Sequence, residues 1–128
     1  MNLKIRPIST NDQLQVILIL NKAFNTPKSL TLNEDYIADQ NIYSFISEVD
    51  KKIVGTASLH IVNKINRKVG LIEDVAILPS HRGKGIGLKL IKQRINKCKK
   101  LNLQLLTDFL IRKKSKKCLT LYQMNMIF

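Results

Sequence analysis

The sequence feature that most restricts the fold is a glycine-rich segment, Arg82-Gly83-Lys84-Gly85-Ile86-Gly87. Residues 69–78 before it have the pattern of a buried strand, and residues 85–98 have the apolar spacing of a helix. Glycines at alternate positions let a backbone adopt positive φ angles and approach a ligand closely. The first N–H groups of a helix have no partner within it and, with the helix dipole, attract anions. Strand, loop and helix therefore predict a site for a pyrophosphate, with Arg82 and Lys84 adding positive charge.

The rest of the chain alternates strand-like and helix-like runs, without repeats, a linker or a low-complexity tail. Three strand-like runs in the middle are joined by short polar turns, which favours antiparallel neighbours. We expect strands at 3–8, 43–49, 53–62, 69–78 and 101–109, and helices at 12–24, 33–40, 85–98 and 115–126. Residues 1–128 then form one α/β domain of order β-α-α-β-β-β-α-β-α, with a mixed, mostly antiparallel sheet flanked by helices.

The glycine segment fits one phosphate-binding signature better than two others. A Walker loop needs Gly-Lys followed by Ser or Thr, which the sequence lacks. A dinucleotide fingerprint needs G-x-G-x-x-G, and here the third glycine comes one place early, although Asp108 lies about 20 residues further on. Too little chain follows the loop for a parallel dinucleotide domain. The pattern Arg82-x-x-Gly85-x-Gly87 resembles the Q/R-x-x-G-x-G/A motif of the GNAT superfamily of N-acetyltransferases without adjustment.

The resemblance extends into the strand before the loop. Residues 71–77, with their Glu73-Asp74 pair, are similar to the glucosamine-6-phosphate N-acetyltransferases, and this closer likeness covers residues 69–90. The resemblance implies a GNAT fold, acetyl-CoA as co-substrate and no metal. It implies acetyl transfer to glucosamine 6-phosphate, a step toward UDP-N-acetylglucosamine, or to another small or protein amine. It places the coenzyme at Val75, Ala76, Ile77, Arg82, Gly83, Lys84, Gly85, Ile86 and Gly87.

Three residues are candidate catalytic groups by the same resemblance. Glu73 and Asp74 are adjacent in a strand, which predicts that their side chains point to opposite faces. The resemblance puts this pair at the substrate amine, to bind or deprotonate it, and the alternative is one exposed carboxylate and one lysine ion pair. Tyr122 matches the family tyrosine whose hydroxyl serves the sulfur of coenzyme A, and the alternative is a tyrosine of the core.

The C-terminal segment departs from the family pattern. Cys118 stands where the family has Asn, and Met126 stands where it has Gly. We also expect the last strand or strands of the family to be missing. A relative that binds coenzyme A without catalysis is therefore an alternative. A sheet edge left open tends to pair, which favours a homodimer.

Charge adds a further constraint on partners. Lys and Arg number 22 against nine Asp and Glu, giving a formal charge of +13. Such a field attracts anions, although Lys, Asn and Ile are also abundant in proteins of AT-rich genomes. The charge suits a sugar phosphate. A basic nucleic-acid-binding module is a remote alternative, because no helix-turn-helix, zinc or RNP-like pattern is present and aromatic residues are few.

The two cysteines and the apolar runs indicate a cellular location. Cys98 and Cys118 form neither a metal-binding pattern nor a disulfide framework. No signal peptide opens the sequence, and no run of about 18 apolar residues could span a membrane. We therefore expect reduced thiols and a cytoplasmic protein.

Overall fold

The computed structural model describes residues 2–25, 32–101, 104–105 and 126–127. Its elements, with η for a 3-10 helix, are β1 (Leu3–Pro7), η1 (Thr10–Asp12), α1 (Gln13–Phe24), α2 (Glu34–Ala38), β2 (Ile42–Val49), β3 (Lys52–Asn63), β4 (Lys68–Ile77), η2 (Pro79–His81), α3 (Ile86–Lys100), β5 (Gln104–Leu105) and β6 (Met126–Ile127). The elements from β1 to α3 that the sequence predicted agree with the structure to within two residues at each end. The predicted α/β fold class is confirmed.

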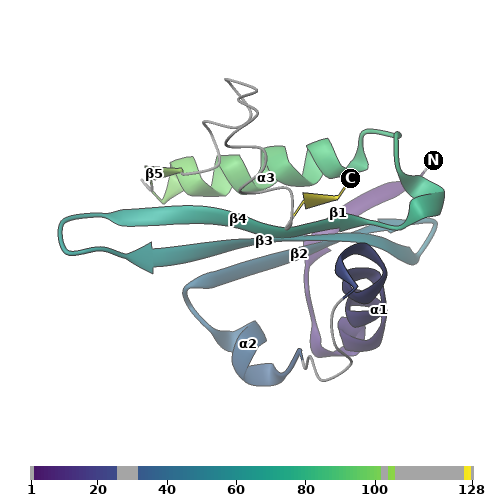
Figure 1. Cartoon of the computed structure of the whole chain (residues 1–128), viewed down its shortest axis with the longest axis horizontal. Coiled ribbons are helices and arrows are strands. Elements are labelled where there is room, and N and C mark those ends of the chain that lie inside the picture. Colours follow the sequence, from purple (N-terminus) through teal and green to yellow (C-terminus); the bar gives the residue numbers. More distant parts are fainter. Residues whose placement is uncertain (1, 26–31, 102–103, 106–125, 128) are drawn as a thin grey trace.

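Within the described part of the chain, a six-stranded sheet separates two helical layers. Strands β1 to β4 are antiparallel neighbours in that order, while β5 and β6 both run parallel to β4. Helix α3 covers one face of the sheet, and α1 and α2 lie on the other (Figure 1). The β2–β3 hairpin turns through Asp50 and Lys51, whose φ angles of 51° and 70° are left-handed. Two left-handed residues make the tight turn that matches the twist of the strands.

The end of the chain differs from the sequence prediction. The expected helix at 115–126 lies outside the described residues except for Met126, which the structure places in β6. Met126 pairs with Val75 and Ile127 with Ala76, so the sheet receives a late strand, although we expected the last strands of the family to be missing. Helical spacing was a poor guide here because a short apolar run fits a helix and a strand alike. Of the expected strand at 101–109, the structure describes β5.

A core of aliphatic side chains fixes α3 against the sheet. Three helix residues, Ile86, Leu90 and Ile91, are buried against β3 and β4. Most lysines of the helix, such as Lys92, stay exposed, whereas Arg94 is buried with its guanidinium over the ring of Phe45. Burial of one apolar stripe aligns a helix on a sheet. This packing holds the start of α3 close to the end of β4, so a short connection joins them.

An ion-pair network ties the start of α1 to the sheet. Arg6 in β1 donates from Nη1 and Nη2 to the two carboxylate oxygens of Asp12, each at 2.8 Å. Its Nε donates to Glu48 of β2 at 2.7 Å. The Asp12 side chain is 5% exposed, and the Arg6 guanidinium lowers the pKa of that carboxyl. This network holds the helix that forms one wall of the site described below.

Replacing Asp12 by Asn should destabilise the fold. The charge-assisted bonds to Arg6 would weaken, and each such bond contributes about 1.5–3 kcal/mol. We expect a loss of that size in the free energy of unfolding at pH 7, measured by urea denaturation. Because the folded pKa of Asp12 is lowered, the stabilisation is complete above its unfolded pKa of about 4 and is lost as the pH falls through the folded value. The control is Asp35→Asn on the exposed start of α2, and an equal loss in both variants would contradict the role of the network.

Candidate active site

The glycine segment follows η2, which comes just after β4, and runs into the start of α3. Gly83 and Gly85 have φ angles of 76° and 80°, a conformation that other residues adopt at a cost. A Cβ atom added at either glycine would meet no atom within 4 Å. The glycines are therefore required by the backbone conformation, and the space around the loop is open to a ligand.

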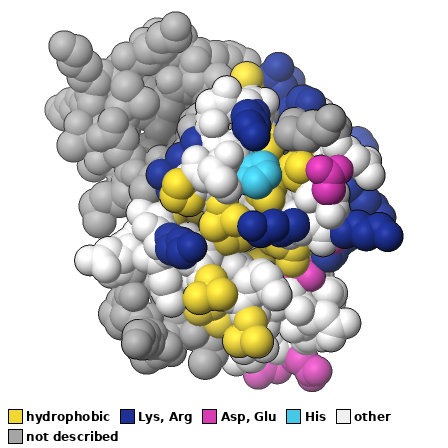
Figure 2. Space-filling view, turned by 90° about the vertical axis from the view of Figure 1, so that its right-hand side faces the viewer, with side chains coloured by type: hydrophobic (Ala, Val, Ile, Leu, Met, Phe, Trp, Pro, Cys, Tyr) yellow, Lys and Arg dark blue, Asp and Glu magenta, His cyan; other side chains and the backbone are white. Residues whose placement is uncertain are grey.

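Positive charge surrounds this loop. The side chains of Arg82 and Lys84 are exposed, and Arg82 Nε donates to the carbonyl oxygen of Ile77 at 2.9 Å, which ties the loop to β4. The end of the molecule that carries the loop presents several Lys and Arg side chains (Figure 2). The N-terminal end of α3 adds the positive end of its dipole. Open backbone and positive charge together suit a pyrophosphate.

A β-bulge reshapes β4 shortly before the loop. Thr56 of β3 pairs with Ala76 and Ser58 pairs with Glu73, so Asp74 and Val75 lie opposite the single residue Ala57. Asp74 has a φ angle of 55°, which aspartate tolerates better than most residues. A bulge commonly re-aims a side chain in this way.

The bulge brings both carboxylates to one side of the sheet. The register puts Glu73 on the same face as Ser58, and Asp74 lines a cavity together with Ser58 and Thr56. The prediction that the two carboxylates point to opposite faces is therefore wrong, because strict alternation stops at a bulge. The cavity holds about 210 Å³ and lies between the sheet and α1.

A polar cluster surrounds Asp74 on this face, made of Asp74, Ser58, His60 and Tyr36. Ser58 Oγ lies 3.0 Å from His60 Nε2 and donates to the carbonyl oxygen of Glu73 at 3.0 Å. Since a hydroxyl has one proton to donate, His60 Nε2 carries the proton of the bond between them. The rings of Tyr36 and His60 meet edge to face, with centroids 6.2 Å apart.

Burial shifts the proton affinities of the cluster. It raises the pKa of Asp74 above its ordinary value, against the opposing effect of His60. It also raises the pKa of Glu73, and the negative charge of Asp74 adds to that rise. Burial lowers the pKa of His60, so this imidazole is neutral at pH 7. A carboxylate that holds its proton more tightly is a better base near neutral pH.

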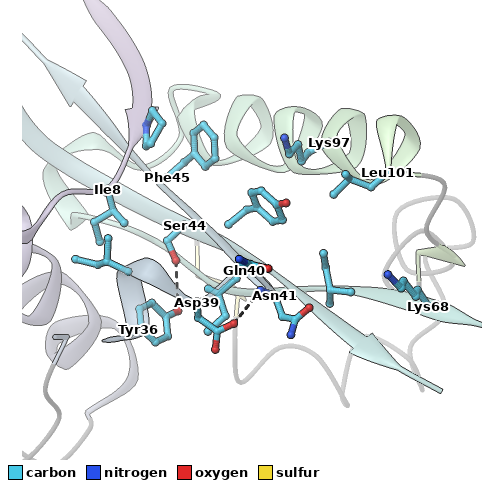
Figure 3. A pocket seen from close by; sticks show the side chains of 15 residues that line it. Ile8, Tyr36, Asp39, Gln40, Asn41, Ser44, Phe45, Lys68, Lys97 and Leu101 are labelled. Atoms are coloured by element: carbon cyan, nitrogen blue, oxygen red, sulfur yellow. Dashed lines mark hydrogen bonds between the residues drawn. The ribbon is translucent and has the colours of Figure 1, made fainter. Parts of the chain in front are cut away.

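A second, larger cavity of about 720 Å³ lies at the edge of the sheet, beside α2, β2 and α3. Figure 3 shows Tyr36 and Asp39 on one side of it and Lys97 and Leu101 of α3 on the other. Tyr36 and Ser44 line both cavities, but Asp74 and the glycine segment are not among the described residues that line the larger one. Size alone would favour the larger cavity as the active site. The carboxylate of Asp74 favours the smaller one.

Several predicted coenzyme residues can offer only their backbone. The side chains of Val75, Ile77 and Ile86 belong to the core beneath α3. Val75 and Ala76 also pair with β6, so an extended ligand chain and β6 would compete for the same backbone edge. Tyr122, Asp108 and Cys118 lie outside the described residues.

His60 and Tyr36 were not among the sequence candidates, yet the structure brings them to Asp74. A signal for His60 was present in the sequence. Ser58 and His60 are two apart in an otherwise apolar strand, which places both on one face, and β4 is the next strand of a predicted hairpin. Tyr36 gave no comparable signal, because α2 reaches the site by tertiary packing.

Among the described residues, no three His, Cys, Asp or Glu side chains are grouped so that they could hold a metal ion. In that same part of the chain, no helix is both long enough and apolar enough to cross a membrane.

Comparison with known proteins identifies the family. Residues 13–125 match the acetyltransferase (GNAT) family, and no curated protein matches the chain. Similar solved structures include glucosamine-6-phosphate N-acetyltransferase from Arabidopsis thaliana, at 23% identity and a TM-score of 0.67, covering 83% of this chain and 81% of that one. A predicted acetyltransferase with acetyl-CoA from Clostridium acetobutylicum is 16% identical, with a TM-score of 0.65 and coverage of 81% and 79%.

A third solved structure has a different kind of acceptor. It is an aminoglycoside acetyltransferase from an uncultured soil metagenomic sample, in complex with sisomicin. It is 22% identical, with a TM-score of 0.67, and the match covers 80% of this chain and 74% of that one. At such identities these likenesses show the fold alone. The family match itself spans the glycine segment and the cluster around Asp74, and this chain therefore belongs to the acetyltransferase (GNAT) family, which uses acetyl-CoA.

Proposed function

We propose that the protein is an acetyl-CoA-dependent N-acetyltransferase that binds its amine acceptor beside Asp74. The observation that carries the proposal is the course of β4. Its bulge presents Asp74 to a cavity on the α1 side, and its end leads through η2 into the glycine segment. A carboxylate suited to an amine and a loop suited to a pyrophosphate thus lie along one strand.

The proposed reaction is a direct transfer without a covalent enzyme intermediate. The neutral amine nitrogen attacks the acetyl carbonyl carbon of the thioester, so a C–N bond forms and the C–S bond breaks. The electron pair of the C–S bond leaves on the sulfur of coenzyme A. The proton released by nitrogen passes to Asp74, directly or through a water molecule, and Glu73 is the second candidate for this role. Holding both reactants side by side supplies much of the rate.

The coenzyme would be bound by backbone N–H groups, because several of the predicted side chains are buried in the core. Its pyrophosphate would accept hydrogen bonds from N–H groups between Gly83 and Gly87, where the loop is open and charged. The resemblance adds the backbone of residues 75–77, and there β6 would have to give up its pairing with Val75 and Ala76.

Tyr122 is proposed, on the resemblance, as the group that serves the departing sulfur. A phenol can protonate the thiolate or stabilise it by a hydrogen bond. Tyr122→Phe keeps the ring, so it should lower kcat by about a hundredfold while coenzyme affinity barely changes. Steady-state kinetics and calorimetry measure the two quantities. An unchanged kcat would remove Tyr122 from the mechanism and leave water as the proton source.

The acceptor that the sequence resemblance favours is glucosamine 6-phosphate, in UDP-N-acetylglucosamine synthesis. The net charge of +13 is consistent with an anionic acceptor. This finer assignment stays a prediction.

A homodimer also stays a prediction. The expected open sheet edge was the reason for the homodimer, but β6 occupies part of that edge at Val75 and Ala76. Sedimentation measures the oligomeric state, and a fully active monomer at micromolar concentration would exclude an obligatory dimer.

The function is tested by release of coenzyme A in the presence of a panel of primary amines. Release that requires both acetyl-CoA and an amine supports acetyl transfer. Tight binding of acetyl-CoA without turnover of any amine would favour a relative that only binds the coenzyme. Absence of binding by a folded chain would reject the proposal.

A further inference from the structure

The cavity beside Asp74 has one strongly apolar wall. Helix α1 contributes Val16, Ile17, Leu20 and Phe24, which recur at helical spacing and line the cavity together. Ile8 and Leu32 extend this wall on either side. A ligand that fills the cavity must therefore place carbon, not hydroxyl groups, against α1.

The opposite wall is polar, but the protons of its serine and threonine hydroxyls are already donated within the protein. Ser58 donates to the carbonyl oxygen of Glu73 at 3.0 Å, and Thr56 donates to the carbonyl oxygen of Phe45 at 3.3 Å. Ser44 donates to the Tyr36 hydroxyl at 3.3 Å. A sugar hydroxyl buried here could donate to these oxygens but could not accept their protons, and each polar group left without a partner costs about 1–3 kcal/mol.

Asp74 is the only charged residue among the described residues that line this cavity. An amine nitrogen is complementary to that carboxylate. A phosphate would instead need Lys or Arg, and none of the described lining residues is either. The volume of about 210 Å³ is also below the roughly 300–1,000 Å³ typical of pockets for drug-sized ligands.

From these walls we infer that the acceptor is a small primary amine carried on an apolar body, with its nitrogen at Asp74 and its carbon body against α1. The inference rests on the proposed acetyl transfer and specifies its substrate class. It disfavours glucosamine 6-phosphate, which the sequence resemblance predicts. It also assigns α1 the role of selecting the acceptor.

The experiment compares acceptors with the full chain at saturating acetyl-CoA and pH 8. The probes are 3-methylbutylamine, glucosamine and glucosamine 6-phosphate, and the quantity measured is kcat/KM for release of coenzyme A. We expect 3-methylbutylamine to exceed both sugars by about tenfold or more, the scale on which apolar pockets discriminate. Calorimetry of 3-methylbutylamine with the chain, with and without coenzyme A, measures binding without turnover.

A matched pair of variants tests the wall itself. Leu20→Gln places an amide at the cavity, whereas Leu18→Gln makes the same change on the same helix at a side chain that is 58% exposed. Leu20→Gln should lower kcat/KM for 3-methylbutylamine about tenfold and leave acetyl-CoA affinity unchanged. Leu18→Gln should change neither quantity.

The outcomes separate this inference from the proposed function. A higher kcat/KM for either sugar, no detectable binding of 3-methylbutylamine, or equal effects of the two variants would overturn the apolar acceptor. The first of these results would leave the acetyltransferase proposal intact. Failure to bind acetyl-CoA, with 3-methylbutylamine still bound and weakened by Leu20→Gln, would instead reject the acetyl transfer and keep the amine site.

Discussion

Asp74→Asn should lower kcat/KM for acetyl transfer by about a hundredfold or more, the usual scale of general-base catalysis. Asparagine has the same size and also tolerates the left-handed φ angle of 55° at this bulge. The substitution therefore removes the charge and the base while leaving the backbone in place. The measurement is release of coenzyme A with the best amine, and acetyl-CoA affinity should stay unchanged.

The same substitution should stabilise the fold, which distinguishes a functional carboxylate from a structural one. Burial raises the pKa of Asp74, so the folded protein loses stability as the pH rises from the unfolded pKa of this carboxyl to its higher folded pKa. Below the unfolded pKa of about 4 the carboxyl is neutral in both states and the cost vanishes. Asp74→Asn should therefore unfold at a higher temperature than the parent at pH 7 and at a similar temperature at pH 3.

Asp50→Asn is the matched control for both measurements. Asp50 is also an aspartate with a left-handed φ angle, 51°, but it is exposed in the β2–β3 turn. We expect neither activity nor thermal stability to change appreciably in this variant. Loss of stability in Asp74→Asn, or full activity, would contradict the role assigned to Asp74.

Gly85→Asn should weaken acetyl-CoA binding by about a hundredfold, the effect of losing one or two charge-assisted hydrogen bonds of about 1.5–3 kcal/mol each. Gly85 has a φ angle of 80° and nothing within 4 Å of its would-be Cβ. Asparagine is among the residues that accept a left-handed conformation, so the fold should persist while the new side chain fills the phosphate position. Calorimetric titration with acetyl-CoA measures the change.

The control for this variant is Lys51→Asn, which makes the same residue at an exposed left-handed position with a φ angle of 70°. Its coenzyme affinity should match that of the parent. If Gly85→Asn is folded and binds acetyl-CoA equally well, the glycine segment is not the pyrophosphate site.

Local sequence patterns predicted most of this fold because the decisive signals are local. The apolar spacing of α3, the Asp50-Lys51 turn and the strand before the glycine segment each depend on neighbouring residues. The conformation of Met126 does not, since pairing with Val75 across the sheet decides it. A short apolar run carries too little periodicity to reveal such a partner.

The sequence predicted the glycine segment of the candidate site, but only part of the cavity beside Asp74. The glycine segment has a sequence signature because only glycine adopts its backbone angles at no cost. Asp74 could be singled out as a carboxylate in an apolar strand, but its direction depends on a bulge that strict alternation does not predict. The approach of His60 and Tyr36 to Asp74 depends on strand register and on packing of α2, which are properties of the tertiary structure.

The most direct test of acetyl transfer is mass spectrometry of a reaction containing the full chain, acetyl-CoA and a panel of primary amines. The account predicts an N-acetylated amine, formed in equal amount to coenzyme A and about a hundredfold more slowly in the Asp74→Asn variant. A folded chain that leaves every amine unmodified, or that releases coenzyme A without acetylating an amine, would contradict it.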